Sequence, residues 1–201
     1  PGEDPLEAAR RELGIPEGKP LVVSVWGSLG ASHMNEIMTD FILRACAKPF
    51  FSLIHSAGKA GYSKMSAELE SEKPDYAKLG MDVRAYIYDM PRVMAAADLV
   101  LCRAGASTLA ELTAMGKPAI LVPSPNVTNN HQERNARVLE AAGGAKVMLE
   151  QEFTADSLLG LVSELLQHPE QLEEMSQNML KLAVPDATDR IAAEVLELAS
   201  K

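Results

Sequence analysis

Short apolar segments alternate with helical segments about six times along this chain, and this alternation limits the possible folds more than any other feature of the sequence. Apolar segments such as Leu21-Val-Val-Ser-Val25 are β-branched and almost free of polar residues. Strands of this kind are typical of parallel sheets whose two faces are both covered by helices. The sequence therefore predicts an α/β fold with a doubly wound sheet of about six parallel strands.

The predicted elements place several turns at one edge of this sheet. Strands are expected at residues 21–25, 50–55, 83–87, 99–102, 118–122 and 145–149. Helices are expected at residues 5–13, 32–46, 66–72, 91–97, 108–115, 129–142, 154–168, 169–182 and 186–199. Ligands of such sheets bind beyond the carboxyl ends of the strands. The turns expected there follow Val25, Ile87, Cys102 and Val122.

Charge and cysteine content exclude several classes of protein. The formal net charge of −9 argues against a general nucleic-acid binder, although helix N-termini can still hold an anionic ligand. Two cysteines, Cys46 and Cys102, are too few for a disulfide framework and lack metal-ligand spacing. We expect both to be buried thiols. No apolar run approaches the ~20 residues that span a bilayer, and no signal peptide is recognisable, so we expect a cytoplasmic setting.

The turn Trp26-Gly-Ser-Leu-Gly30 follows the first strand. It matches neither a dinucleotide fingerprint nor a P-loop. A plain strand-to-helix turn and a phosphate cradle are both compatible with it. Ser28 and the backbone amides near Gly30 are placed for contact with an anion.

The segment from Arg103 to Glu111 is more informative. Gly105 allows close approach of a ligand, and the backbone amides that follow it should open a helix that points at the ligand. Glu111 lies one turn beyond Thr108 on the same helix face, where a carboxylate can accept hydrogen bonds from both hydroxyls of a ribose. The pattern Thr108-x-x-Glu111 equally fits a capping box, so both interpretations stay open.

A second polar cluster, His131, Gln132 and Asn135, lies near the start of the next helix. Amides and imidazole suit sugar hydroxyls, which both donate and accept hydrogen bonds. The alternative is an ordinary polar first turn. His55 ends a strand on the same rim, with no clear role. No Ser-His-Asp order, metal cluster or pair of catalytic carboxylates is evident, so we expect no catalytic residue and no metal in this chain.

Several motifs occur together in an order and spacing that resemble the C-terminal half of glycosyltransferase family 28. They are Gly27-Ser-Leu-Gly-Ala31, Ile87-Tyr-Asp-Met90, Cys102-Arg-Ala-Gly-Ala106, Glu111, Gly116-Lys-Pro118 and Gln132-x-x-Asn135-Ala136. The resemblance runs from about Pro5 to the end. It implies a single domain over residues 1–201, the Rossmann-like donor-binding half of a two-domain GT-B glycosyltransferase. The nearest members add N-acetylglucosamine (GlcNAc) to an undecaprenyl-linked muramyl pentapeptide, converting lipid I to lipid II in peptidoglycan synthesis.

The resemblance also implies roles for individual residues toward UDP-GlcNAc, which is a substrate rather than a cofactor. Glu111 would bind the ribose hydroxyls and the backbone at Ile87 would pair with the uracil edge. The expected contacts of the diphosphate are Ser28, Gly30, Gly105, Ala106, Ser107 and Thr108, and those of the sugar are His131, Gln132 and Asn135. Three positions depart from the family pattern, because Trp26 replaces a usual Gly, Leu29 a common Gln, and His131 a frequent Gln.

The family's N-terminal domain has no counterpart in this sequence. That domain carries the lipid-linked acceptor, the candidate general base and most of the membrane-facing surface. Because the chain starts at Pro1 without Met, we expect an excised or processed piece that binds UDP or UDP-GlcNAc and turns nothing over. The full-length enzyme is expected to lie peripherally on the inner face of the bacterial cell membrane.

Three other functions are compatible with the sequence. The chain could belong to another UDP-hexose lipid glycosyltransferase, which moves glucose or galactose. It could come from a UDP-GlcNAc 2-epimerase, although the carboxylates and histidines that such an isomerase needs are not evident. It could also be the donor-binding subunit of a naturally split transferase.

Overall fold

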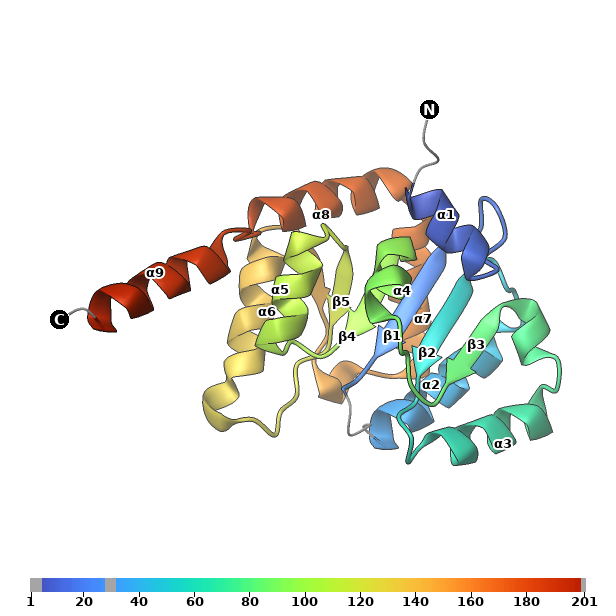
Figure 1. The fold of residues 1–201 in the computed structure, drawn as a ribbon. Coiled ribbons are helices and arrows are strands. Elements are labelled where there is room, and N and C mark those ends of the chain that lie inside the picture. Colours follow the sequence, from blue (N-terminus) through green and yellow to red (C-terminus); the bar gives the residue numbers. More distant parts are fainter. Residues whose placement is uncertain (1–4, 28–31, 200–201) are drawn as a thin grey trace.

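The computed structural model describes residues 5–27 and 32–199, and within them six strands form one sheet (Figure 1). The strands are β1 (Leu21–Val25), β2 (Ser52–Ser56), β3 (Met81–Arg84), β4 (Leu99–Cys102), β5 (Ala119–Leu121) and β6 (Ala145–Val147). Every neighbouring pair is parallel, and the order across the sheet is β3-β2-β1-β4-β5-β6. The predicted α/β fold with about six parallel strands is confirmed.

Helices connect the strands and extend the chain beyond them. They are α1 (Pro5–Glu12), α2 (Ser32–Ala45), α3 (Tyr62–Glu72), α4 (Met90–Ala96), α5 (Ala106–Ala114), α6 (His131–Ala141), α7 (Ala155–Gln167), α8 (Pro169–Lys181) and α9 (Ala187–Ala199). Single 3₁₀ turns lie at η1 (Tyr76–Leu79), η2 (Thr128–Asn130) and η3 (Glu150–Glu152). The capping box at the start of α7 confirms Thr154 as its N-cap, because the Thr154 hydroxyl accepts from the Ser157 amide at 3.1 Å.

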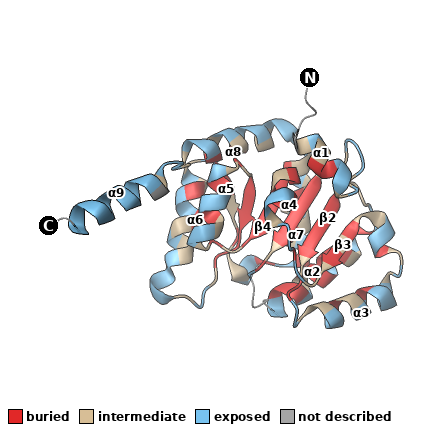
Figure 2. Ribbon diagram, viewed as in Figure 1, coloured by how far each residue is buried: buried red, intermediate tan, exposed pale blue. Residues whose placement is uncertain are grey.

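The sheet is covered on both faces, which explains why its strands are almost continuously apolar (Figure 2). Side chains alternate between two cores along β1: Val22 packs in the core beneath α2, α3 and α7, whereas Leu21 and Val23 pack in the core beneath α1, α4, α5 and α6. All three are fully buried. This alternation fixes which face of the sheet each of these side chains covers.

The strand order creates a crevice at one position on the carboxyl edge of the sheet. The chain runs from β1 outward through β2 to β3 and then returns to place β4 on the other side of β1. The loops after β1 and β4 therefore leave in opposite directions. In open α/β sheets this topological switch point is where ligands bind.

Some element boundaries differ from the sequence prediction. The third strand, predicted at residues 83–87, spans Met81–Arg84 instead, so Ile87 lies in the loop that follows it. Helix α3 begins at Tyr62, four residues earlier than predicted, and α5 begins at Ala106 rather than at residue 108. These shifts matter because they move Ile87 and Thr108 relative to the rim.

Helix α9 stands apart from the rest of the fold. It projects from the body beyond α8 (Figure 1), and its residues 189–199 are all exposed (Figure 2). Four large apolar side chains on it are 58–71% exposed: Ile191, Val195, Leu196 and Leu198. Three of them follow helical spacing, so they form one apolar stripe.

Candidate functional site

A cavity of about 560 Å³ opens at the switch point between β1 and β4. Five strands contribute their last residue or the loop that follows to its lining: Val25 to Gly27 at β1, Ser56 and Gly58 at β2, Tyr86 and Ile87 after β3, Arg103 and Gly105 after β4, and Ser124 after β5. Thr108 and Glu111 of α5 and Gln132 of α6 complete the wall. The cavity therefore lies where the sequence predicted a ligand to bind, and it has the size of small-molecule sites.

The loop after β1 contributes a buried aromatic side chain. Trp26 is only 5% exposed, and its ring meets Phe153 edge to face, with the ring centroids 5.4 Å apart. Gly27 has a φ of +98°, a left-handed conformation that favours glycine. Ser28 and Gly30, predicted to contact the diphosphate, lie outside the described residues.

The start of α5 presents backbone donors to the cavity. Gly105 is the N-cap, with extended backbone at φ −71° and ψ 144°, and no side-chain hydrogen bond caps the helix. The first N–H groups of a helix lack partners within it and carry partial positive charge. Gly105 and Thr108 line the cavity, whereas Ala106 and Ser107 are exposed and are not among the residues that line it. The arrangement suits an anionic group.

Glu111 lines the same cavity. The capping-box alternative for this residue required Thr108 to be the N-cap, and that interpretation is wrong, because the helix begins two residues earlier and Gly105 is its N-cap. The Glu111 carboxylate lies one turn beyond Thr108 on the cavity side. It can therefore accept hydrogen bonds from a bound ligand.

The second predicted polar cluster is only partly directed at the cavity. Gln132 lines it, and its side-chain Oε1 accepts from the Ser124 backbone amide at 3.0 Å. His131 is exposed, with Nδ1 3.0 Å from the Thr128 carbonyl oxygen. Asn135 is half-buried, and neither it nor His131 is among the described residues that line the cavity. Their contact with a sugar stays a prediction.

One wall of the cavity is apolar. It includes Ile87, which is 3% exposed, together with Met90 and Met94. Tyr86 stands beside it in edge-to-face contact with Tyr88, the ring centroids being 4.9 Å apart. A planar aromatic group of a ligand could pack its apolar surface against this wall, where its removal from water is favourable.

Arg103 is a residue at this site whose role the sequence did not reveal. Its Nη1 lies 2.6 Å from a Glu150 carboxylate oxygen and donates to the carbonyl oxygens of Val122 and Pro123 at 3.1 and 3.2 Å. The ends of β4 and β5 are thereby tied to η3. Glu150 is distant in sequence, so no local motif could have indicated the pair.

The two cysteines confirm the sequence prediction, because Cys46 and Cys102 are both buried free thiols. Burial raises the pKa of Cys102 to about 12. Cys102 lines the cavity, but a thiol with such a pKa is not a nucleophile at neutral pH. No group of three His, Cys, Asp or Glu side chains that could hold a metal ion occurs in the described part of the chain.

The chain matches the model of the glycosyltransferase family 28 C-terminal domain over residues 21–191. It is 43% identical over 186 residues to a UDP-N-acetylglucosamine--N-acetylmuramyl-(pentapeptide) pyrophosphoryl-undecaprenol N-acetylglucosamine transferase of Acetivibrio thermocellus, covering 92% of this chain and 49% of the relative. A protein of the same name from Desulforudis audaxviator is 41% identical, with 97% and 52% covered. The chain thus spans about half the length of the curated relatives it matches.

Solved structures show the same architecture. MurG of Acinetobacter baumannii superposes with a TM-score of 0.76 at 27% identity, covering 90% of this chain and 53% of that one. Anabaena Alr3699/HepE, solved in complex with UDP-glucose, superposes at 0.69 with 16% identity over 98% of this chain and 54% of that one, a likeness of fold alone. The family match over residues 21–191 covers most of the sequence, and the chain therefore belongs to the glycosyltransferase family 28 C-terminal domain family.

Proposed function

We propose that this chain is the UDP-GlcNAc-binding half of an inverting N-acetylglucosaminyltransferase that converts lipid I to lipid II. The observation that carries the proposal is the cavity at the switch point, where Glu111, the open N-terminus of α5 and Gln132 meet an apolar wall. Glu111 suits the hydroxyls of a ribose, the N-terminus of α5 suits a diphosphate, Gln132 suits a sugar, and the apolar wall suits a nucleobase. The names of the relatives that share most of this sequence support the same donor.

Each part of the donor has a proposed partner. The Glu111 carboxylate accepts hydrogen bonds from the two ribose hydroxyls, each worth roughly 1.5–3 kcal/mol because the acceptor is charged. The backbone at Ile87 pairs with the uracil edge, beside Met90 and Met94. The amides that open α5 hold the diphosphate, and Gln132 donates to the sugar.

The proposed reaction is a single displacement at the anomeric carbon. A hydroxyl oxygen of the acceptor forms the new bond to that carbon, the bond to the β-phosphate oxygen breaks, and UDP leaves with the electron pair. The hydroxyl proton passes to a base on the other half of the full-length enzyme. The amides of α5 stabilise the charge that develops on the leaving diphosphate, and no metal ion is required in this proposal.

The other half is proposed to be the partner of this chain in cis and to carry the lipid-linked acceptor. The doubled length of the curated relatives supports this, and so does the exposed apolar stripe of α9, since stripes of that kind mark interaction surfaces. No helix in the described ranges has the length and apolar character needed to cross a bilayer. Because the acceptor is a lipid, we propose that the full-length protein binds peripherally to the inner face of the bacterial membrane.

Calorimetry tests the donor site directly. We expect UDP and UDP-GlcNAc to bind the chain with dissociation constants below the millimolar range, and to bind equally well in EDTA and in Mg²⁺. The absence of heat from UDP at millimolar concentration would overturn the donor-site assignment. Incubation with donor and a lipid I analogue should give no product from this chain alone.

The same titration distinguishes the alternative functions. UDP-GlcNAc should bind at least several-fold more tightly than UDP-glucose and UDP-galactose if the chain serves a GlcNAc transferase. Equal or reversed affinities would favour another UDP-hexose transferase. The solved UDP-GlcNAc 2-epimerase of Neisseria meningitidis shares the fold at 15% identity, a likeness that carries no argument about activity.

A further inference from the structure

A chain of three buried polar side chains lies beneath the rim of the cavity, on three different elements. His55 of β2 is fully buried, with Nδ1 3.0 Å from the Ser24 hydroxyl of β1 and Nε2 3.3 Å from Oδ1 of Asn35 in α2. Ser24 is fully buried and Asn35 is 7% exposed. Most buried polar groups have hydrogen-bond partners because an unpaired one is costly, so these three linked side chains help to fix the positions of the elements that carry them.

The hydrogen-bond pattern defines the protonation of the imidazole. Asn35 Nδ2 donates to the Ala57 carbonyl oxygen at 2.7 Å, which leaves Oδ1 as the acceptor that faces His55. Nε2 of His55 therefore carries the proton, and Nδ1 accepts from the Ser24 hydroxyl at 3.0 Å, since the other possible acceptor of that hydroxyl, Met38 Sδ, is a weaker one at 3.7 Å. Burial lowers the pKa of His55 to about 3, so the imidazole is neutral at physiological pH. Each polar atom of the ring has a partner.

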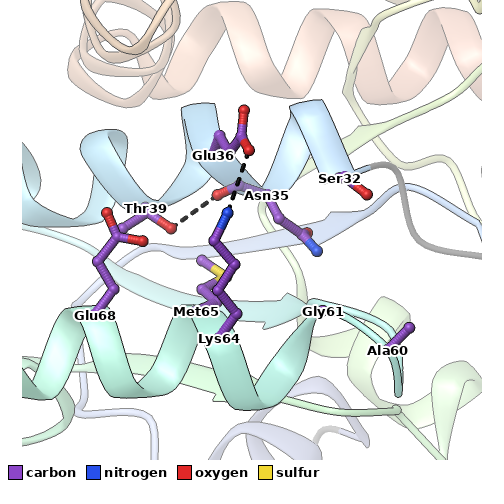
Figure 3. A pocket seen from close by; sticks show the side chains of 9 residues that line it. All are labelled: Ser32, Asn35, Glu36, Thr39, Ala60, Gly61, Lys64, Met65 and Glu68. Atoms are coloured by element: carbon purple, nitrogen blue, oxygen red, sulfur yellow. Dashed lines mark hydrogen bonds and ion pairs between the residues drawn. The ribbon is translucent and has the colours of Figure 1, made fainter.

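Gly61, the N-cap residue of α3, closes the network from the outside. A Cβ at this position would overlap Asn35 Nδ2 and would lie 2.8 Å from the Ala57 carbonyl oxygen. Its φ of −89° is ordinary for any residue, so glycine is needed for space rather than for backbone conformation. Figure 3 shows the Asn35 side chain directed from α2 toward the turn at Gly61. The amide is thus enclosed between the starts of two helices.

The network joins the first turn of α2 to a loop of the candidate site. Asn35 lies in that first turn, since α2 begins at Ser32. Its partner Ala57 lies between Ser56 and Gly58, which both line the cavity. Because α2 follows β1 in a parallel sheet, its N-terminus points to the rim, and a helix N-terminus attracts phosphate. A shift of the Asn35 amide would therefore move the first turn of α2 and the loop around Ala57 together.

We propose that Asn35, held by His55 and enclosed by Gly61, is a positioning residue that sets the first turn of α2 and the Ser56–Gly58 loop for the diphosphate of the nucleotide. The inference rests on the proposed function. It adds residues that are not among those lining the 560 Å³ cavity at the switch point. It predicts a selective effect. Disturbing the amide should weaken ligands that carry a diphosphate and spare the nucleoside.

The test compares UDP with uridine in three variants. Asn35→Ala removes the amide, and Gly61→Ala displaces it without deleting any polar group. Gly160→Ala is the matched control, because a Cβ at Gly160 on the exposed side of α7 meets nothing within 4 Å. Two-dimensional NMR titration measures dissociation constants into the millimolar range and also reports whether each variant is folded.

We expect Asn35→Ala and Gly61→Ala to raise the dissociation constant of UDP at least fivefold and that of uridine by less than twofold, with both unchanged in Gly160→Ala. If Asn35→Ala fails to fold, Gly61→Ala alone decides. Equal weakening of UDP and uridine, or unchanged UDP binding in a folded variant, would overturn the positioning role. If the unsubstituted chain binds no UDP, the proposed function fails first, and the two failures are therefore distinguishable.

The imidazole offers an independent readout. Its ¹⁵N resonances should show the neutral Nε2–H form in the unsubstituted chain between pH 5 and 8. In Gly61→Ala the Nε2 resonance should shift as the bond to Asn35 lengthens. An Nδ1–H form in the unsubstituted chain would contradict the hydrogen-bond pattern on which the inference depends.

Discussion

The backbone amide of Ser124 donates to the side-chain Oε1 of Gln132 at 3.0 Å, and this bond determines which end of the Gln132 side chain a ligand can meet. The carbonyl oxygen is occupied by the loop after β5, so the NH₂ group is the part left for the cavity. Gln132 can therefore donate to a sugar hydroxyl, and the loop that carries Ser124 holds it in place.

Replacing Gln132 should affect the sugar and spare the nucleotide. We expect Gln132→Met, which keeps the side-chain length but loses both the amide donor and the oxygen that accepts from Ser124, to weaken UDP-GlcNAc by roughly 3–10-fold, the equivalent of one ligand hydrogen bond of about 1 kcal/mol. Binding of UDP should change less than twofold in the same calorimetric titration. Gln167→Met, at an exposed position on α7, is the control. Equal losses for both ligands would mean that Gln132 only supports the loop.

Glu111 should determine the preference for ribose. Glu111→Ala is expected to weaken UDP at least tenfold, roughly 1.4 kcal/mol, while 2′-deoxy-UDP, which lacks one of the two hydroxyls, should lose less. The melting temperature should stay close to that of the unsubstituted chain, since the carboxylate does not cap α5. Glu164→Ala, exposed on α7, controls for the lost charge. An unchanged affinity for UDP would remove Glu111 from the site.

The sequence predicted correctly two strands whose apolar residues are almost all buried within the sheet. The strands β1 (Leu21–Val25) and β4 (Leu99–Cys102) have the predicted bounds, because the sheet buries both faces of these apolar runs. The third strand, at the edge of the sheet, was predicted at residues 83–87 but spans Met81–Arg84. Ile87 was assigned to it for its apolar side chain, but the residue is buried beside the cavity instead. The presence of an apolar residue in the sequence does not show whether it is buried within a strand or beside a cavity.

The candidate site could be predicted only where its residues are close in sequence. Helical spacing placed Thr108 and Glu111 on one face, and both line the cavity. The bonds from His55 to Asn35 and from Arg103 to Glu150 join separate elements, so they depend on strand order and helix packing that a single sequence does not supply. The sequence left the role of His55 open for this reason.

The Arg103–Glu150 pair should contribute more to stability than an exposed ion pair. The two side chains are 16% and 23% exposed, and removing one partner leaves the other charge poorly compensated. We expect Glu150→Gln to lower the free energy of unfolding in urea by about 1–3 kcal/mol. Glu36→Gln breaks the exposed pair with Lys64, whose side chains are 61% and 74% exposed, and should cost less than about 1 kcal/mol. Similar costs for the two variants would contradict the structural role of Arg103.

Because the His55 imidazole is buried, the free energy of unfolding should begin to fall at a higher pH than the protonation of carboxylates alone would cause. His55 has a pKa of about 3 in the folded chain and about 6.5 when unfolded. Between these values the unfolded state binds the extra proton, so this stabilising contribution is complete above pH 6.5 and is lost as the pH falls toward 3. By pH 5 the loss should reach about 2 kcal/mol. Urea unfolding at pH 7, 6 and 5 measures it, and His55→Gln should show a flatter slope than the unsubstituted chain, whereas His33→Gln should not.

Helix α9 should be ordered only when its apolar stripe is covered. A helix of 13 residues whose large apolar side chains are exposed is marginal in water, and Ile191, Val195 and Leu198 are 58–70% exposed. In hydrogen exchange we expect the amides of residues 187–199 to exchange within seconds here, and at least a hundredfold more slowly in a longer protein that includes the proposed acceptor half. The amides of α7, which packs on the sheet in either context, provide the internal reference. Slow exchange of α9 in the present chain would show that another surface covers the stripe, and equal fast exchange in the longer protein would remove α9 from the interface between the halves.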